Sequence, residues 1–345
     1  MAKPDVAGEA ASAALPPTTR TRRFLDRTAQ LRELGLIVAL VLLCIGFASA
    51  KPVFFSSRNI LNMAQQSALL GIMSVGMTFV LVSGEVDLSV GSTFGLAGMV
   101  SGLLMSHGHA IWWSCLAGLA AGFLVGLLNG LITTYGRLPS FIVTLGTLSV
   151  VRGATQVLSN GLPATVDASG VRDVALPTFL WLGQGQLFSQ LPSEALIMLA
   201  IAGVGAVVLA MTTFGFRVYA VGGSAKAAQI CGIDVAKVKI AAFVIMGVLA
   251  AIAGVLNLSF LQNVSPESGV GLELQVIAAA IIGGTSLAGG EGSILGTLLG
   301  VAILGVLSNG LVLLGVSPFW QTAFIGVVII AAVGIDRWLP GRARS

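Results

Sequence analysis

The chain has 345 residues, of which 56% are hydrophobic and only 9% are charged, and its mean hydropathy is +0.97. Soluble domains carry about 25% charged residues, so this composition excludes a water-soluble globule and, with it, the disordered, collagen-like, disulfide-framework and nucleic-acid-binding classes. The net charge of +4 indicates basic loops that face anionic lipid. We predict an all-α, polytopic transmembrane helical bundle.

The sequence divides into three regions. Residues 1–33 are rich in Ala, Pro, Thr and Arg and are expected to form a disordered, basic tail. Residues 34–336 form the membrane domain, and residues 337–345 form a second basic tail. The cysteines, Cys44, Cys115 and Cys231, are far apart, so neither a disulfide nor a metal site is expected from them.

About ten apolar segments predict membrane spans. They cover residues 34–50, 64–83, 91–105, 112–134, 141–158, 195–213, 238–260, 275–286, 293–314 and 319–335. Two of them, 91–105 and 275–286, are shorter than the ~20 residues that a straight spanning helix needs. We expect these two to be broken or re-entrant, with their free backbone groups shielded by protein or water.

The distribution of Lys and Arg predicts the orientation. With ten spans, the N-terminal arginines, Arg137, the basic residues of 217–239 and the C-terminal tail share one side, which we expect to be cytoplasmic. Lys51 and Arg58, in the first loop on the other side, oppose the rule. The longest external segment, 159–194, is a candidate surface for an external partner.

Glycine makes up 45 of the 345 residues, about 13%, against roughly 7% in average proteins, which favours close helix packing. Two glycine stripes hint at a weak inverted repeat of five spans each. The first runs from Gly118 through Asn129 and the second from Gly296 through Asn309, while residues 84–92 parallel 284–293. Chance similarity between glycine-rich helices is the alternative.

The first motif of chemical interest is residues 84–92, which places Glu85 and Asp87 between two apolar runs. A charge inside a spanning helix costs roughly 2.5–3.5 kcal/mol on insertion scales, so it usually has a partner or a function. Asp87 is interpreted as a cap for a helix that begins near Ser89, in preference to a proton or ion site.

The second motif is the longest predicted cytoplasmic loop, residues 214–234. Small residues at Ala225, Ala228 and Gly232 predict a short helix with one thin face, suited to a groove on another protein. The alternative is an ordinary surface helix.

The third motif, residues 282–293, is a glycine-rich turn that could bind phosphate at a helix start. The sequence has no G-x-x-x-x-G-K-[ST] pattern, so we expect no P-loop ATP site in this chain.

These three motifs, together with residues 315–321 (Gly-Val-Ser-Pro-Phe-Trp-Gln), resemble the ribose-type sugar permeases of bacterial ABC importers. The resemblance runs from about residue 32 to residue 336. It implies a permease subunit of the bacterial inner membrane that translocates a monosaccharide, namely a pentose or a related sugar or polyol, by alternating access and without covalent chemistry. The N- and C-termini would be cytoplasmic.

The resemblance also implies partners: a second permease subunit, in a homodimer, a cytoplasmic ATPase that binds ATP and Mg, and a periplasmic or lipid-anchored sugar-binding protein. This chain itself would hold no cofactor. The loop around Ala227, Ala228 and Gly232 would be the coupling helix that docks on the ATPase. Many relatives have an acidic residue where this chain has Lys226, which puts a shared acidic contact in doubt. The residues assigned to coupling are Arg217, Gly222, Gly223, Ala225, Lys226, Ala227, Ala228, Gly232 and Ile233.

A further set of residues are candidates for helix breaks or for the pore. These residues are Glu85, Asp87, Ser89, Asn129, Gln275, Thr285, Ser286, Asn309, Phe319 and Trp320. Asn129 and Asn309 suit packing between helices or a pore lining. Phe319 and Trp320 suit sugar stacking or an interfacial aromatic belt. Arg152 lies in an apolar run and should face protein or water.

A rival interpretation is an ion-coupled secondary sugar transporter that uses Glu85 or Asp87. A membrane-embedded enzyme is disfavoured, because no His, Cys or Ser/Lys constellation has catalytic spacing. The loop 225–233 distinguishes the ABC permease from the ion-coupled transporter, because a transporter that works without an ATPase has no use for such a loop. The sequence names neither the sugar nor whether the two permeases are identical.

Overall fold

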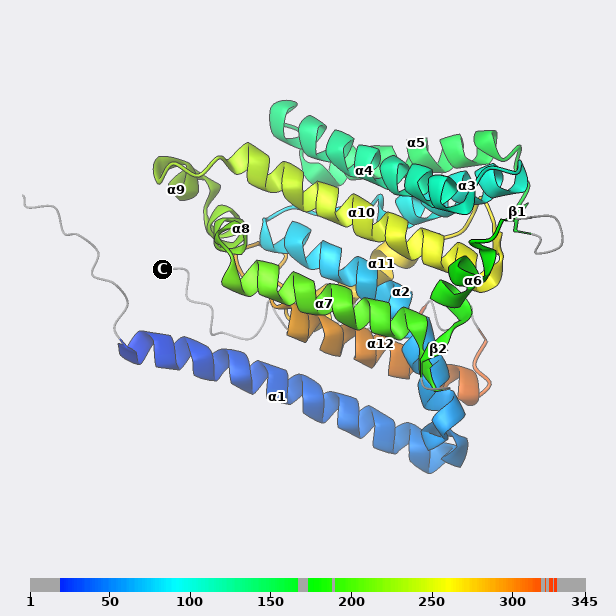
Figure 1. The fold of residues 1–345 in the computed structure, drawn as a ribbon. Helices are drawn as coiled ribbons and strands as arrows, with labels where there is room; N and C mark the ends of the chain where they lie inside the picture. The colour runs from blue at the N-terminus through cyan, green and yellow to red at the C-terminus, as the bar shows by residue number, and fades with distance from the viewer. Residues whose placement is uncertain are drawn as a thin grey trace, which may run out of the picture.

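The computed structural model describes residues 19–166, 173–187, 190–317, 320, 323–324 and 326–327, with side chains from Glu33 onward. Long helices run side by side as a bundle, and short helices and strands lie at its two ends (Figure 1). The long and intermediate helices are α1 (Thr19–Ala50), α2 (Ser57–Val82), α3 (Val90–Ser106), α4 (Ile111–Tyr135), α5 (Ser140–Leu158), α7 (Ser193–Met211), α10 (Val235–Leu261), α11 (Leu272–Ile282) and α12 (Ile294–Leu313).

The short elements are η1 (Pro52–Phe55), β1 (Ala164–Thr165), α6 (Leu176–Gln184), β2 (Gln186–Leu187), β3 (Leu191–Pro192), α8 (Thr213–Gly223), α9 (Ala225–Ile230) and β4 (Asn263–Val264). β1 pairs antiparallel with β4, and β2 with β3. The segment 159–194, predicted only as a long loop, therefore contains a helix and three strands.

The helices confirm the prediction of a polytopic bundle. Among the described residues, seven helices are long and apolar enough to cross a membrane: α1 from Glu33, α2, α4, α5, α7, α10 and α12. The two segments predicted to be short form α3 and α11, with 17 and 11 residues. The tenth predicted span, 319–335, lies almost wholly outside the described residues.

The structure describes only part of the two predicted tails. Helix α1 begins at Thr19, upstream of the predicted span and inside the segment 1–33 that was expected to be disordered. Residues 1–18 and 337–345 lie outside the described residues.

Helix α2 lies at the centre of the bundle, where it packs against α7, α10, α11 and α12. Of its most apolar window, 78% is buried, including Ile72, Met73 and Met77 at 0% exposure. Residues 70–82, the second half of α2, are all buried, and their mainly apolar sequence fits a helix segment that lies in a core.

The predicted glycine stripe of α4 is where α4 and α10 approach each other. A Cβ at Gly126 would collide with the carbonyl of Phe243, and a Cβ at Gly247 would collide with the carbonyl of Gly122. The helices thus touch backbone to backbone, as small residues allow in a membrane.

The two glycine-rich breaks do not occupy equivalent places in the chain. The break at 84–89 leads into α3, and the α4 stripe follows one helix later, whereas the break at 283–293 leads directly into the stripe of α12. The two halves therefore differ by one helix at the positions where the sequence suggested a repeat.

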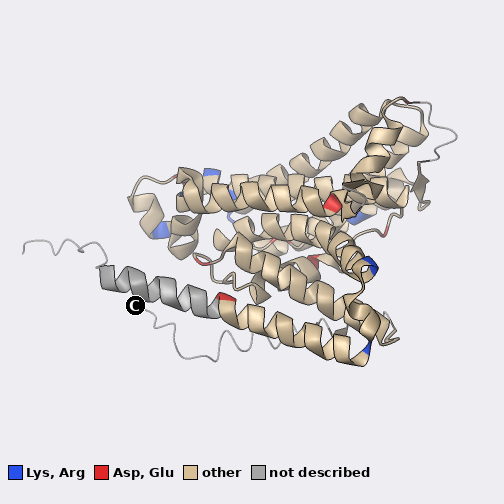
Figure 2. Cartoon of the chain, turned by 60° about the horizontal axis from the view of Figure 1, so that its bottom comes forward, with Lys and Arg blue, Asp and Glu red and all other residues tan. Residues whose placement is uncertain are grey.

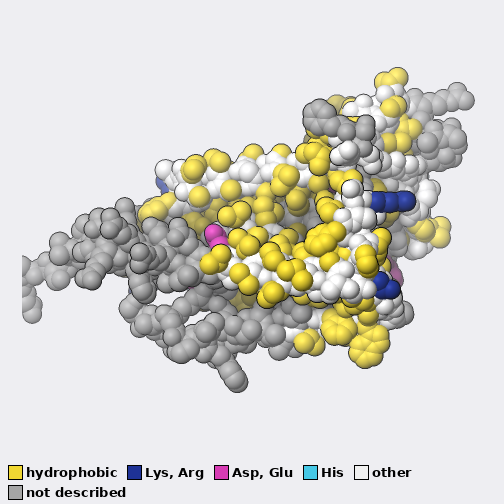
Figure 3. Space-filling view, turned by 90° about the horizontal axis from the view of Figure 1, so that it is seen from below, with side chains coloured by type: hydrophobic (Ala, Val, Ile, Leu, Met, Phe, Trp, Pro, Cys, Tyr) yellow, Lys and Arg dark blue, Asp and Glu magenta, His cyan; other side chains and the backbone are white. Residues whose placement is uncertain are grey.

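Charges gather toward the ends of the bundle, and its sides are apolar. Most Lys, Arg, Asp and Glu residues lie near the helix ends (Figure 2). The face seen from below in Figure 1 is covered mainly by hydrophobic side chains (Figure 3). Along α1 the exposed ones are Leu34, Ile37, Val38, Val41, Leu42 and Ile45. Such a band is what a lipid-facing surface requires.

At the end that carries α6, Asp173 ties the loop before α6 to α4. Its carboxylate accepts hydrogen bonds from the Ala175 amide at 2.9 Å and from the Ile111 amide at 2.8 Å. These backbone amides lower the pKa of Asp173. The ionised carboxylate therefore anchors this loop at the start of α4.

Asn309 joins α12 to α2 through a reciprocal pair of amide hydrogen bonds. Asn59 donates to Asn309 at 2.9 Å and accepts from it at 3.0 Å, and both side chains are buried. The sequence left open whether Asn309 packs between helices or lines the pore, and this contact is one of packing.

We expect Asn309→Leu to lower the free energy of unfolding by about 1–3 kcal/mol, because it leaves the buried Asn59 carbonyl oxygen without a partner. Thermal unfolding of the purified full chain in detergent measures the change. The double variant Asn59→Leu/Asn309→Leu should recover only part of this loss, because Asn59 also donates to the Phe54 carbonyl at 2.9 Å and that carbonyl then has no side-chain donor. An Asn309→Leu melting temperature equal to that of the wild type would contradict the assignment.

Candidate functional site

The segment predicted as a docking loop folds into two short helices at one end of the bundle (Figure 1). Thr212 caps α8 by accepting from the Gly215 amide at 3.2 Å, and Ser224 caps α9 by accepting from the Ala227 amide at 3.2 Å. Gly232 ends the segment with φ +81°, a conformation that favours glycine. The two capping residues and this glycine are local sequence features that determine where the two short helices begin and end.

The exposed surface of α9 differs from the predicted thin face. Ala225, Lys226 and Ala227 are exposed, as are Arg217, Gly223 and Gly232, but Ala228 is only 4% exposed and packs into the core. The expectation that Ala225, Ala228 and Gly232 form one exposed face is therefore wrong. A helix of six residues must turn one side inward, and Ala228 lies on that side.

Two exposed apolar side chains of this segment carry no signal in the sequence: Phe216 in α8, which is 69% exposed, and Ile230. Ile230 is 79% exposed at the end of α9. Beside it, a recess of about 490 Å³ lies between α8 and the start of α10. The recess is lined by Phe214, Arg217, Cys231, Gly232, Ile233, Asp234, Lys237, Val238 and Ala241. Its mixed apolar and charged lining suits contact with a protein surface.

Asp234 caps α10 at the edge of this recess. Its carboxylate accepts a hydrogen bond from the Lys237 amide at 3.1 Å and pairs with the Lys237 ammonium at 3.0 Å. These contacts lower the pKa of Asp234, with the backbone hydrogen bond as the main cause. The recess therefore presents a solvent-exposed ion pair at its edge.

Helix α8 touches the end of α2 and the glycine-rich turn before α12 at a junction around Gly222. The Gly290 amide donates to the Val82 carbonyl at 2.9 Å. A Cβ on Gly222 would collide with that same carbonyl and would come within 2.6 Å of the Gly290 nitrogen. The three segments thus meet backbone to backbone, which only glycine permits.

Two aromatic side chains of α8 extend this junction. The Tyr219 hydroxyl donates to the Gly292 carbonyl at 2.7 Å, and the Phe214 ring stacks on Phe79 of α2 with centroids 6.3 Å apart. Burial raises the pKa of Tyr219, so the hydroxyl keeps its proton. A displacement of α8 must therefore move α2 or the turn 283–293.

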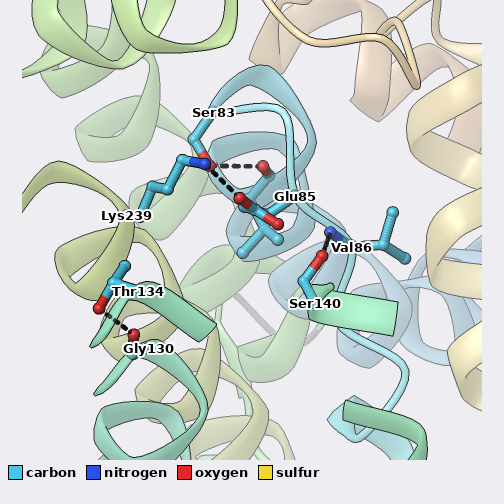
Figure 4. Close-up of polar contacts among 8 residues, drawn as sticks. Ser83, Glu85, Val86, Gly130, Thr134, Ser140 and Lys239 are labelled. Carbon is cyan, nitrogen blue, oxygen red and sulfur yellow. Dashed lines mark hydrogen bonds and ion pairs between the residues drawn. The ribbon is translucent and has the colours of Figure 1, made fainter. Parts of the chain in front are cut away.

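The acidic motif lies next to this junction, and its two carboxylates have different partners. Glu85 forms an ion pair with Lys239 of α10 (Figure 4). The Glu85 and Lys239 side chains are 11% and 20% exposed. Lys239 was counted in the sequence only as part of a basic cluster, because a pairing over 154 positions leaves no local signal.

Asp87 lies at the entrance to α3 and is 2% exposed. Its carboxylate accepts from the Ser89 amide at 2.8 Å and from the Ser89 hydroxyl at 2.6 Å. Asn129 of α4 donates to the same hydroxyl at 2.9 Å. Asp87, Ser89 and Asn129 thus form one buried network that holds the broken segment against α4.

The remaining candidate residues do not converge on one site. Thr285 is buried without a hydrogen bond for its hydroxyl, and Ser286 accepts from the Ala288 amide at 3.2 Å inside the same turn. Gln275 lines a cavity at the opposite end of the bundle. Trp320 is 65% exposed, and Phe319 lies outside the described residues.

Arg152 has a partner that the sequence could not name. Its guanidinium donates to the carbonyls of Pro266 at 3.0 Å and Ser268 at 2.7 Å, in the loop between β4 and α11. It therefore faces protein, as expected for a cation in an apolar helix.

The comparisons with known proteins agree on one family. The family model described as "Branched-chain amino acid transport system / permease component" matches residues 59–333. The chain is 38% identical over 322 residues to the ribose import permease protein RbsC of Escherichia coli (strain K12), covering 92% of this chain and 98% of that protein.

Two further relatives match at similar levels. The ribose import permease protein RbsC of Bacillus subtilis (strain 168) is 40% identical over 308 residues, covering 89% of this chain and 93% of that protein. The L-arabinose ABC transporter permease protein AraH of Azospirillum brasilense is 35% identical over 315 residues, covering 90% and 89%. A solved inward-facing conformation of a metal-chelate type ABC transporter is also similar, with a TM-score of 0.47 and 13% identity over 90% of this chain and 99% of that one.

We expect Lys239→Met to lower the free energy of unfolding by about 1–3 kcal/mol, because it leaves the largely buried Glu85 carboxylate without its ion pair. Lys237→Met is the matched control, two residues away on α10, where the side chain is 81% exposed and its loss should leave stability unchanged. Thermal unfolding in detergent measures both. Equal effects of the two substitutions would contradict a special role for the Glu85 pair.

Proposed function

Because the chain belongs to the family of transport-system permease components, we propose that it is the membrane subunit of an ATP-driven importer for a pentose or a related monosaccharide. The family's description refers to branched-chain amino acids, whereas the three relatives reported above are named for ribose or L-arabinose. Both sugars are pentoses, and at 35–40% identity over at least 89% of this chain the relatives support this class of substrate.

The observation that carries the proposal is the junction of α8 with α2 and the turn 283–293. A chain that only formed a channel would not need α8 and α9, two short helices at the end of the bundle, of which α8 is in contact with its central helix α2. An ATPase docked on α8 and α9 would push on Gly222 and Tyr219. The push would pass to α2, the core of the bundle, and to the turn that starts α12.

Partners are assigned to the two ends of the bundle. The α8–α9 end, with Ile230, Lys226 and the recess beside Asp234, would face the cytoplasm and bind the ATPase, which holds ATP and Mg and performs hydrolysis. The opposite end, with α6 and the short strands, would receive the sugar-binding protein. A second copy of the chain would complete the pore, and both termini would be cytoplasmic in the inner membrane.

The transport step would be alternating access. The sugar leaves the binding protein, enters between the helices from the α6 end and is released at the α8–α9 end when the bundle changes shape. No residue of this chain forms a covalent bond to the sugar. The permease supplies a path and a mechanical linkage, and the energy comes from the ATPase.

The rival, an ion-coupled transporter that uses Glu85 or Asp87, finds less support. Glu85 is paired with Lys239, and Asp87 is held by Ser89. A carboxylate that must bind and release an ion or a proton in each cycle would have to break these contacts.

In proteoliposomes, we expect the purified chain alone to accumulate no radiolabelled D-ribose, L-arabinose or D-xylose. Accumulation of at least one sugar should require the ATPase, the binding protein and ATP together. A control without ATP but with a proton or sodium gradient should show no uptake. Gradient-driven uptake by the lone chain that is abolished by Asp87→Asn would instead establish the rival mechanism.

A second expectation concerns the linkage. Gly222→Ala should strongly reduce ATP-driven sugar transport, because the added Cβ forces α8 away from the Val82 carbonyl, and overpacking of this kind costs about 1–3 kcal/mol. Gly223→Ala is the matched control, since a Cβ there meets no atom within 4 Å. Transport by the assembled importer is measured, with the amount of inserted permease checked by immunoblot. Equal transport by the two variants would refute the linkage.

A further inference from the structure

A polar cavity of about 400 Å³ lies among α2, α3, α10, α11 and α12. It is near the end of the bundle opposite α8 and α9, because Gln66 lies in the third turn of α2 and Asn257 lies one turn before the end of α10. The lining residues are Gln66, Ser67, Leu69, Leu70, Met73, Phe94, Asn257, Leu261, Ser268, Gly269, Val270, Leu272, Gln275, Leu304, Gly305 and Ser308.

Three amide side chains from three different helices line this cavity without partners. Within the described part of the chain, the side chains of Gln66 (α2), Asn257 (α10) and Gln275 (α11) make no hydrogen bond. Asn257 and Gln275 are partly buried. By contrast, Gln65, the neighbour of Gln66, donates to the Gly183 carbonyl at 3.3 Å.

An amide side chain without a hydrogen-bond partner costs free energy inside the helical bundle. An amide that leaves water without a compensating hydrogen bond destabilises the fold, and lipid offers no partner. Gln66 is exposed, but Asn257 and Gln275 are partly buried, and these two amides require water or a polar ligand in the cavity. Structural amides of this chain, such as Asn59 and Asn309, satisfy each other instead.

The lining restricts the ligand. Among the described residues that line the cavity there is no Asp, Glu, Lys or Arg, so an ion would find no opposite charge on them. Each amide offers both donors and an acceptor, and Ser67 and Ser308 add hydroxyls. Leu70, Met73 and Phe94 provide apolar surface beside them. A neutral molecule with many hydroxyls and exposed C–H faces fits this mixture, and the volume lies in the range of small-ligand sites, roughly 300–1,000 Å³.

We propose that this cavity is a monosaccharide-binding site within a single permease chain, in which Gln66, Asn257 and Gln275 bind sugar hydroxyls. The site lies inside one copy of the bundle and is not formed between two copies. The inference rests on the proposed function, since the sugar is the one that the importer carries. In this arrangement the permease itself contributes to sugar selectivity, in addition to the binding protein.

The test uses the complete importer in nanodiscs, with Cys44, Cys115 and Cys231 replaced by alanine and Ser308→Cys as a reporter. A hydrophilic methanethiosulfonate reagent should modify the new thiol, because the cavity is open to water. The sugar that the wild-type importer transports, chosen among D-ribose, L-arabinose and D-xylose, should slow this modification in a saturable way. Ser67→Cys is the second reporter, for use where Ser308→Cys does not assemble.

Two variants make the test specific. Asn62→Cys is the matched control, one turn before Gln66 on α2, where the side chain is exposed and does not line the cavity. It should be modified at the same rate with and without sugar. On the Ser308→Cys background, Gln275→Leu should raise the sugar concentration for half-protection about fivefold, the factor for a lost hydrogen bond of about 1 kcal/mol.

The outcomes separate the inference from the proposed function. If the importer transports a sugar but the reporters are unmodified, or are modified without sugar protection, the site is refuted and the function stands. Equal protection at Asn62→Cys would also refute it, because the sugar would then act through a global change. If the complete importer transports none of the three sugars, the proposed function fails and the site fails with it.

Discussion

The structure depends on one constraint: polar groups inside the membrane must find partners within the protein, because lipid offers none. The break between α2 and α3 meets it through Asp87, Ser89 and Asn129, and the Arg152 guanidinium meets it through the carbonyls of Pro266 and Ser268. The Asn129 contact with Ser89 joins residues 40 positions apart, and the Arg152 contacts join residues more than 110 positions apart. The same contacts that satisfy the polar groups therefore fix which helices are neighbours.

The structure also depends on close contact between helix backbones at glycine residues. Between α4 and α10 such contact is static packing, but around Gly222 it connects two exposed short helices to the most buried helix of the bundle. A rigid contact of this kind transmits displacement because no flexible side chain separates the backbones. The Glu85–Lys239 pair beside it ties the start of α10 to the same region, so three helix ends would move together.

The sequence predicted the class of protein and the positions of nine helices closely, because long apolar runs and lysine or arginine patterns are local signals. It also located the segment that forms α8 and α9 and the break at Asp87. It missed α6 and the short strands, whose sequences lack length and periodicity. It misplaced Ala228, because the face that a six-residue helix turns inward depends on its neighbours.

By itself, then, the sequence determined a polytopic helical bundle, its glycine stripes and the positions of its helix breaks, since these follow from composition and spacing along the chain. Only the tertiary structure decided that Glu85 pairs with Lys239, that Asn309 pairs with Asn59, and that Gln66, Asn257 and Gln275 surround one cavity. The physical reason is separation: Glu85 and Lys239 are 154 positions apart and the two asparagines are 250 positions apart, and no local pattern records a contact over such distances.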